Sequence, residues 1–138
     1  MSGLLAFAAA LFLLLSGSIP AAAQSPDIDC SNAVSTVEMK FCAGQDYDLA
    51  DAELNAIWKK VMAHARSADK DWLPEGAPTR VDLLRDAQRK WIAYRDAACE
   101  AEATKFYGGT GQTLILVVCL TNKTNQRTAD LRSYMAEG

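Results

Sequence analysis

Four cysteines limit how this chain of 138 residues can fold. An even number of cysteines in an oxidising compartment indicates paired disulfides. A zinc site or a thioredoxin-type redox motif would need a close C-x-x-C pair, which the spacing does not contain, and His64 is the only histidine. We therefore expect no metal and no cofactor, and two disulfides that use Cys30, Cys42, Cys99 and Cys119.

The first 23 residues predict the oxidising compartment. Leu4 to Leu15 is an uncharged apolar run. It is followed by the helix-breaking stretch 16–20 and by the small residues 21–23. This order is typical of a secretory signal peptide, and the run is shorter than the roughly 20 apolar residues of a membrane span. No cysteine follows closely, as a lipid anchor would need. We expect a signal peptide (1–23) and a secreted or periplasmic domain (24–138) without a stable membrane anchor.

The spacing of the cysteines favours one pairing. Gly109, in the glycine-rich stretch 108–111, lies midway between Cys99 and Cys119. In an antiparallel helical hairpin, residues placed symmetrically about the turn face each other, so a Cys99–Cys119 bridge would clamp such a hairpin. Cys30 and Cys42 would then form the second bridge. Four cysteines allow three pairings, and this is the one we favour.

Apolar residues in the exported domain recur at helical spacing, without convincing strand-like alternation. We expect a short helix over 36–43 closed by Gly44, then helices over about 46–65, 79–105 and 113–134, with a loop at 66–79. The apolar run 114–120 could be a buried strand, but it has no second strand to pair with, so we expect helix. The predicted fold class is all-α: a small disulfide-stapled helical bundle or hairpin, with three main helices plus a short N-terminal helix.

Two of these helices have a predicted inner face. For the second helix it comprises Tyr47, Ala50, Leu54, Ile57, Trp58, Val61 and Ala65. For the third it comprises Val81, Leu84, Gln88, Trp91, Arg95, Ala98 and Glu102, with Tyr94 and Cys99 beside it. Aromatic residues at helical spacing are core residues by default.

Two stretches carry more than an amphipathic pattern. One runs from Cys42-Ala43 through Tyr47-Asp48-Leu49-Ala50-Asp51-Ala52-Glu53-Leu54-Asn55 to Trp58, and the other from Leu84 through Gln88-Arg89-Lys90-Trp91-Ile92-Ala93-Tyr94-Arg95-Asp96 to Cys99. Together with the glycine-rich stretch, Cys119, Arg127 and Leu131, they resemble the lysozyme-inhibitor LprI-type family over about residues 30–132. The Q-R-x-W-x-x-Y-R-D-x-x-C run is the most specific part.

The resemblance implies an exported helical domain and, for some members, inhibition of lysozyme. It transfers no inhibitory residue, and the matching polar positions look structural. Asp51 and Asn55 share one helix face, and Gln88, Trp91 and Arg95 share another. We expect Arg95 to pair with Asp51 across the packed helices, with Gln88 and Asn55 satisfying neighbouring polar atoms.

Acidic side chains gather early in the exported domain. Residues 24–65 carry a net charge of −4 and residues 66–138 a net charge of +1. Asp46, Asp48 and Glu53 are candidate binding residues, because an acidic face would steer the chain onto a basic partner. The alternative, which we favour, is that they complement the positive end of a helix. The total charge of −3 argues against a nucleic-acid partner.

The glycine-rich loop is the second binding candidate, since loops commonly carry recognition. An inhibitor can insert such a loop into a glycosidase cleft, with polar side chains as sugar mimics. Equally, glycines simply permit a tight turn. The candidate residues are Tyr107, Gly108, Gly109, Thr110, Gly111 and Gln112.

The residues that could support catalysis have simpler explanations. His64 lacks an evident nucleophile partner, and the Asp82/Asp86 and Asp96/Glu100 pairs are flanked by basic residues typical of a salt-bridged surface. We therefore expect a binding protein, not an enzyme. The leading hypothesis is inhibition of a lysozyme-type muramidase by occlusion of its cleft. The alternative is a non-inhibitory envelope module that binds peptidoglycan fragments or another envelope protein. The sequence makes no prediction of oligomeric state.

Overall fold

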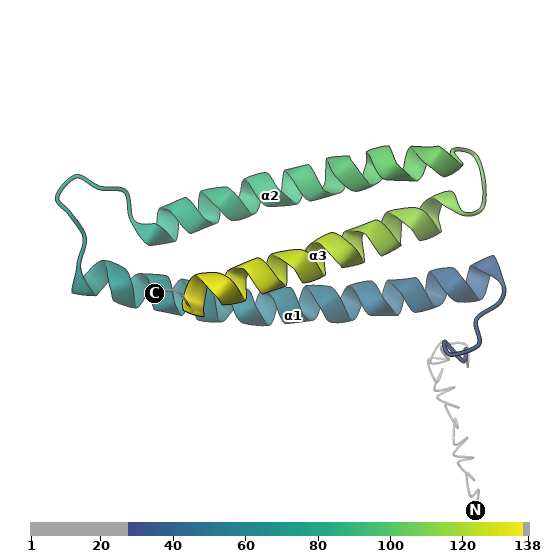
Figure 1. The fold of residues 1–138 in the computed structure, drawn as a ribbon, viewed down its shortest axis with the longest axis horizontal. Coiled ribbons are helices and arrows are strands. Elements are labelled where there is room, and N and C mark those ends of the chain that lie inside the picture. Colours follow the sequence, from purple (N-terminus) through teal and green to yellow (C-terminus); the bar gives the residue numbers. More distant parts are fainter. Residues whose placement is uncertain (1–27, 137–138) are drawn as a thin grey trace, which may run out of the picture.

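The computed structural model describes residues 28–136, so the expected signal peptide and its cleavage site lie outside the described residues. Within them the chain forms α1 (Thr36–Asp71), α2 (Arg80–Ala103), the short 3₁₀ helix η1 (Thr104–Phe106) and α3 (Gln112–Ala136), with no strand (Figure 1). The all-α class is confirmed, and so is the helical state of the apolar run 114–120. No helix in this part of the chain is both long enough and apolar enough to cross a bilayer.

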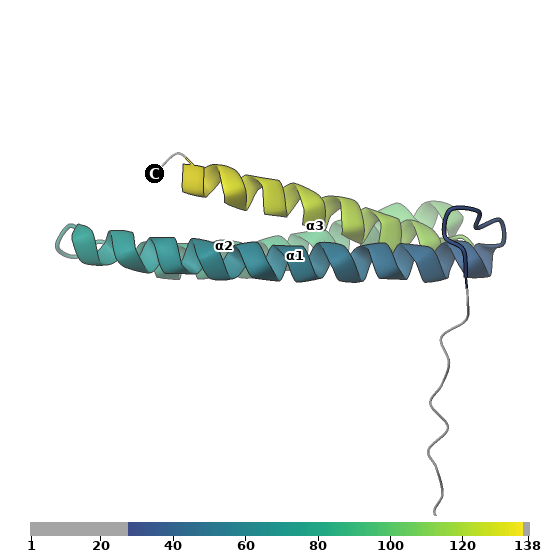
Figure 2. The same cartoon turned by 90° about the horizontal axis from the view of Figure 1, so that it is seen from below.

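The three helices run alongside one another as an elongated bundle. Each connection reverses the chain, so α2 is antiparallel to both α1 and α3, while α1 and α3 are parallel (Figure 1). In Figure 1 α3 lies between α2 and α1, and it packs against both, most extensively against α1. Viewed from below, the end of α3 rises away from the other two helices (Figure 2). At 1.5 Å per residue α1 is about 54 Å long, which sets the length of the molecule.

The core lies between α1 and α3, with α2 closing one side. Leu54, Ile57 and Val61 of α1 and Leu131 of α3 form a buried cluster. Four partly buried side chains pack against it: Trp58, Leu84, Trp91 and Met135. The predicted face of α1 is confirmed, because its aliphatic members are buried and its two aromatic members half-buried. Burial of these side chains supplies most of the helix stability.

The predicted face of α2 is correct in its middle and wrong at two positions. Arg95 and Cys99 are buried, and Val81, Leu84, Gln88, Trp91 and Ala98 are half-buried. Tyr94 and Glu102, however, are exposed. Tyr94 lies at the surface with its ring 5.2 Å from the Lys123 ammonium, a cation–π contact. The buried stripe is narrower than predicted because α2 contacts its neighbours along one side only.

The expected short N-terminal helix is not a separate element. α1 is continuous from Thr36, through Gly44, and continues past the predicted end at Ala65 to Asp71. Gly44 was predicted to end a helix, but it has no positive φ, and a mid-helix glycine costs only about 1 kcal/mol. Burial of Ala43 and Ala50 on either side offsets that cost. Ser35 and Glu38 begin the helix with a reciprocal capping box.

Both favoured disulfides are confirmed. Cys30 is bonded to Cys42, which ties the segment before α1 to the second turn of that helix. Cys99 is bonded to Cys119, which clamps α2 to α3 on either side of the glycine-rich turn. Cys99 and Cys119 are buried, whereas Cys30 is exposed. One bridge therefore lies inside the bundle and the other at its edge.

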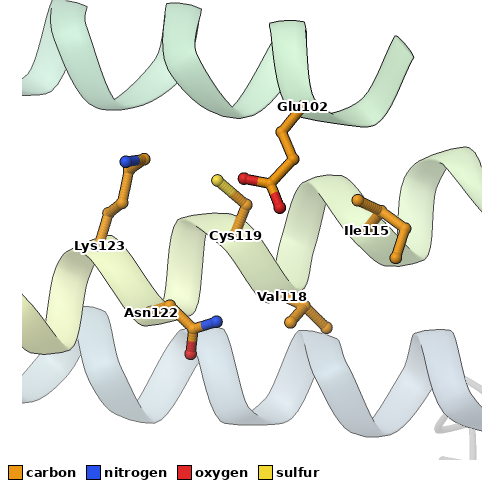
Figure 3. Close-up of a pocket in the computed structure, with 6 residues that line it drawn as sticks. All are labelled: Glu102, Ile115, Val118, Cys119, Asn122 and Lys123. Atoms are coloured by element: carbon orange, nitrogen blue, oxygen red, sulfur yellow. The ribbon is translucent and has the colours of Figure 1, made fainter. Parts of the chain in front are cut away.

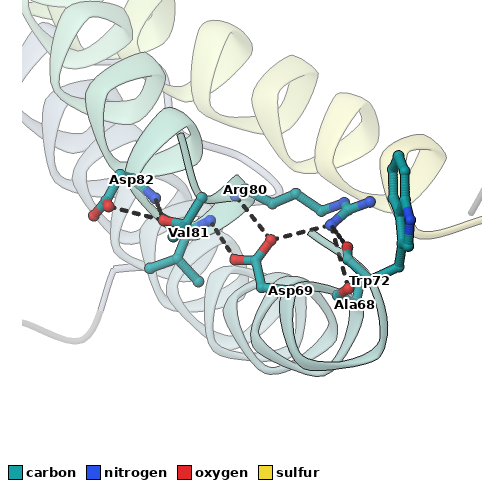
Figure 4. A network of polar contacts seen from close by, with 7 residues as sticks. Ala68, Asp69, Trp72, Arg80, Val81 and Asp82 are labelled. Atoms are coloured by element: carbon teal, nitrogen blue, oxygen red, sulfur yellow. Dashed lines mark hydrogen bonds and ion pairs between the residues drawn. The ribbon is translucent and has the colours of Figure 1, made fainter. Parts of the chain in front are cut away.

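A polar cluster fixes the connection between α1 and α2 (Figure 4). The Asp69 carboxylate accepts hydrogen bonds from the backbone N–H groups of Arg80 and Val81, at 3.0 and 3.2 Å. The Arg80 guanidinium donates to Asp69 at 3.1 Å and to the carbonyl oxygens of Ala68 and Trp72. Thr79 is the N-cap residue of α2, and its side chain accepts a hydrogen bond from the backbone N–H of Asp82. The last turn of α1 and the first turn of α2 are therefore joined directly.

Candidate functional site

The glycine-rich loop is a preformed turn at one end of the bundle. The Tyr107 N–H donates to Thr104 and the Gly109 N–H to the Phe106 carbonyl, at 3.1 and 2.9 Å. Gly108 has a φ of +75°, a conformation that favours glycine. The Gln112 side chain accepts from the Gly108 N–H at 3.2 Å. These three local hydrogen bonds hold the loop in one shape.

The side chains of the loop differ in what they offer to a partner. Tyr107 is 82% exposed and Phe106 is 49% exposed, so two aromatic rings project at this end. Thr110 is also exposed. Gln112 was a candidate sugar mimic, but its carbonyl oxygen already holds the loop, so the structure gives it a positioning role. The exposed Phe106, the last residue of η1, was not predicted as part of this surface.

The three acidic candidates do not share one face of α1. Asp46 and Glu53 line a groove of about 310 Å³ between α1 and α3, together with Leu49, Ala50, Thr121 and Asn125. Asp48 is two residues beyond Asp46, which places it roughly 200° around the helix, away from this groove. Glu53 forms an ion pair with Arg132 of α3. The groove therefore carries one paired and one unpaired carboxylate among the described residues.

The expected Arg95–Asp51 ion pair is not formed among residues 28–136. Arg95 donates from Nε to the carboxylate of its neighbour Asp96 at 2.8 Å and makes a longer contact of 3.4 Å with the Thr124 hydroxyl. Asp51 accepts instead from the Asn55 amide, one turn along the same helix, at 2.8 Å. The prediction was wrong because each group has a partner on its own helix, Asp96 for Arg95 and Asn55 for Asp51. Pairs within one helix do not depend on how two helices are aligned.

Trp91 is the centre of the polar network that does form. The guanidinium carbons of Arg95 and Arg127 lie 5.1 and 5.8 Å from its ring, and Tyr47 also faces Arg95 at 5.9 Å. Arg127 donates to the Gln88 side chain at 3.0 Å. Burial lowers the pKa of Arg127 from its ordinary value, against the opposing charge of Asp130. Arg127 thus contacts both Gln88 and Trp91, and Arg95 contacts Trp91; the contacts of this face with Arg127 and Thr124 of α3 were not predicted.

A groove of about 410 Å³ near the start of α2 is lined by Arg80, Leu83, Leu84, Ala87 and Tyr134. Two further grooves lie beside the later part of α2. One, of about 270 Å³, is lined by Tyr47, Arg95, Asp96, Glu100, Leu116 and Leu120, and leads to the buried guanidinium of Arg95. The other, of about 150 Å³, lies over the Cys99–Cys119 bridge, with Glu102 reaching across from α2 above Cys119 and Lys123 further along α3 (Figure 3). Each groove is lined by both acidic and basic side chains.

The possible catalytic groups have structural contacts. His64 is half-buried, with its ring edge-on to Tyr134 at 6.2 Å. Asp82 pairs with Arg85, and Asp86 pairs with Arg89 and Lys90, as predicted for a salt-bridged surface. Within residues 28–136 no three histidine, cysteine or acidic side chains come together as metal ligands would.

Comparison with known proteins places these features in a family context. The family described as "Lysozyme inhibitor LprI" matches residues 29–131. The "Uncharacterized protein R02472" of Rhizobium meliloti (strain 1021) is 40% identical over 132 residues, covering 94% of this chain and 95% of that protein. The "Uncharacterized protein YecT" of Escherichia coli (strain K12) is 26% identical over 100 residues, covering 70% of this chain and 62% of that protein. No solved structure gives a significant match.

Proposed function

The chain belongs to the lysozyme inhibitor LprI family, and we propose that it inhibits a lysozyme-type muramidase by occluding the substrate cleft of that enzyme. The description of this family names lysozyme inhibition, and two disulfides agree with an extracytoplasmic location.

The observation that carries the proposal is the preformed loop with its exposed aromatic tip. Tyr107 projects from a turn that is already hydrogen-bonded, so little conformational entropy is lost when a partner binds. Tyrosine is among the residues that most often dominate binding energy at protein interfaces. A glycosidase cleft binds sugars through apolar faces and hydrogen bonds, and a phenol offers both. The loop is therefore the segment best suited to enter a cleft.

A turbidity assay tests the proposal directly. The mature protein, added in molar excess to hen-type lysozyme, is expected to slow the lysis of bacterial cell walls. Tyr107→Ala is expected to raise the concentration needed for half-inhibition about tenfold or more, as for a central tyrosine of an interface. Trp72→Ala is the matched control, because Trp72 is also an exposed aromatic residue but lies in the connection at the opposite end of the bundle.

Two glycines provide a second matched pair. Gly108 and Gly76 have φ values of +75° and +74°, and a Cβ at either position would meet no atom within 4 Å. Alanine at either position strains the backbone by about 1 kcal/mol and lowers stability to a similar extent. Only Gly108→Ala is expected to weaken inhibition. Undiminished lysis in the presence of excess wild-type protein would contradict the inhibitor proposal, and binding to purified peptidoglycan fragments would then favour an envelope-binding role.

A further inference from the structure

The antiparallel packing separates charge along the bundle. The end that carries the glycine-rich loop is built from residues 28–55 and 92–126, which contain nine acidic and four basic side chains, a net charge of −5. The opposite end is built from residues 56–91 and 127–136, which contain six acidic and ten basic side chains, a net charge of +4. Residues 28–136 together carry a net charge of only −1. The bundle is nevertheless strongly dipolar, because one end is negative and the other positive.

Local pairing leaves the acidic end open to a partner. Among residues 28–136, two carboxylates at the acidic end, Glu53 and Asp96, form ion pairs, and its other seven do not. At the opposite end three of six are paired: Asp69, Asp82 and Asp86. Unpaired surface carboxylates attract a basic protein over distances of about one Debye length. The acidic end therefore offers charge that the protein itself does not neutralise.

The groove between α1 and α3 combines this charge with exposed apolar surface. Leu49 is 71% exposed on its wall, one turn from Asp46. On the α3 wall the Thr121 hydroxyl donates to the Val117 carbonyl, and the Asn125 amide makes no hydrogen bond within the described residues. The groove therefore combines a carboxylate, an amide and an aliphatic side chain. This combination is complementary to a long aliphatic side chain that ends in a cationic group.

We propose that this groove docks a lysine or arginine side chain of the basic muramidase whose cleft the loop occludes. This inference rests on the proposed function and adds a second contact to it. The aliphatic part of the incoming side chain packs on Leu49, and its cationic group binds Asp46. Glu53 is already paired with Arg132, so Asp46 supplies the uncompensated charge.

One partner can reach the loop and the groove together. Thr121 of the groove is nine positions after Gln112 of the loop, which is about 14 Å along α3. An interface of standard size buries about 800 Å² on each partner, which is roughly 30 Å across. The axial distance between the two contacts is therefore shorter than the width of a single protein–protein interface.

Asp46→Asn and Asp48→Asn form the matched pair that tests the groove. Both substitutions remove one charge from the same exposed stretch of α1, but only Asp46 lines the groove. Binding of the full mature protein to hen-type lysozyme is measured by surface plasmon resonance. Asp46→Asn is expected to raise Kd about fivefold to tenfold, mainly through faster dissociation, and Asp48→Asn less than twofold. Leu49→Ser is expected to raise Kd at least threefold, and circular dichroism checks that each variant is folded.

The outcomes separate this proposal from the proposed function. Equal effects of Asp46→Asn and Asp48→Asn, with inhibition intact in the wild type, would overturn the groove and leave the inhibitor function standing. Binding that depends on Asp46 without any slowing of lysis would support the groove and overturn the inhibitor function. Absence of binding by the wild type would overturn both.

Discussion

At the scale of single residues, Asp69 of α1 acts as a cap for the N-terminus of another helix, α2. Its carboxylate, at the end of α1, accepts the backbone N–H groups of Arg80 and Val81 in the first turn of α2. These are groups that a helix cannot satisfy internally. A carboxylate there also opposes the positive end of the helix dipole. One side chain thereby fixes where α2 starts relative to α1.

Asp69→Asn is expected to lower the melting temperature by several degrees at pH 7. Burial acts to raise the pKa of Asp69, but hydrogen bonds from Arg80 and Val81 outweigh it and lower that pKa below its ordinary value. A pKa lowered in the folded state stabilises the fold above the unfolded pKa of about 4, and the effect is lost as the pH falls through the folded value. Thermal unfolding at pH 7 and at about pH 2 tests this expectation, because the difference from wild type should shrink in acid.

Asp71→Asn is the control for that measurement, since Asp71 is an exposed acidic residue two positions away. It is expected to leave the melting temperature within about one degree of wild type at both pH values. A difference between Asp69→Asn and wild type that stays constant down to the acid end would contradict the carboxylate cap.

The polar network marks the limit of residue-level prediction. The motif itself indicated that Gln88, Trp91 and Arg95 share a face, because their spacing is helical. Which carboxylate Arg95 meets depends on the rotation and separation of two helices, and the sequence does not specify these. The same is true of Arg127, which reaches Trp91 from α3. Helical periodicity identifies neighbours within a helix but not partners across a bundle.

At the scale of elements, the helices and disulfides were predictable and the length of α1 was not. The Cys99–Cys119 bridge follows from its symmetry about the turn, which any hairpin of two regular helices imposes. The extent of α1 depends on a balance of about 1 kcal/mol at Gly44, which packing against α3 decides. Local signals predict strong elements well and their ends less well.

The two disulfides are expected to contribute differently to stability. Replacing Cys99 and Cys119 together with alanine should lower the free energy of unfolding by about 3 kcal/mol, because the bridge restricts the unfolded chain while its native environment is already ordered. Replacing Cys30 and Cys42 should cost clearly less, since the released segment before α1 gains freedom in the folded state as well. Urea unfolding of both double variants tests this, and equal losses would contradict it.

At the scale of the whole molecule, charge separation affects how the protein meets a partner. The dipole turns the acidic end toward a basic protein during diffusion, so productive encounters become more frequent. The linear sequence showed only an acidic first part. It does not reveal that residues 92–126, which carry no net charge, lie beside residues 28–55, while the basic residues 56–91 and 127–136 lie at the other end. The loop of the candidate binding surface could therefore be predicted from the sequence, but the groove between α1 and α3 could not.

Neutralising either end should change the association rate unequally. Replacing the exposed Glu100 and Glu102 with glutamine is expected to slow association with hen-type lysozyme about threefold at low salt. Replacing the exposed Lys59 and Lys60 with glutamine at the other end should change the rate less than 1.5-fold, roughly within the noise of such rates. Stopped-flow mixing at about 20 mM and 500 mM salt measures both, and high salt should abolish the difference. Opposite changes of equal size would mean that net charge alone sets the rate.

The parallel arrangement of α1 and α3 also determines the order in which the chain can fold. Leu54 and Leu131 share one buried cluster although 77 positions separate them. The apolar face of α1 therefore has no lasting cover until the last helix has been synthesised, and closing so long a loop opposes the early stages of folding. The α2–α3 hairpin is local and can form first, ready to receive α1. Until then α1 is the segment exposed to aggregation or to capture by a chaperone.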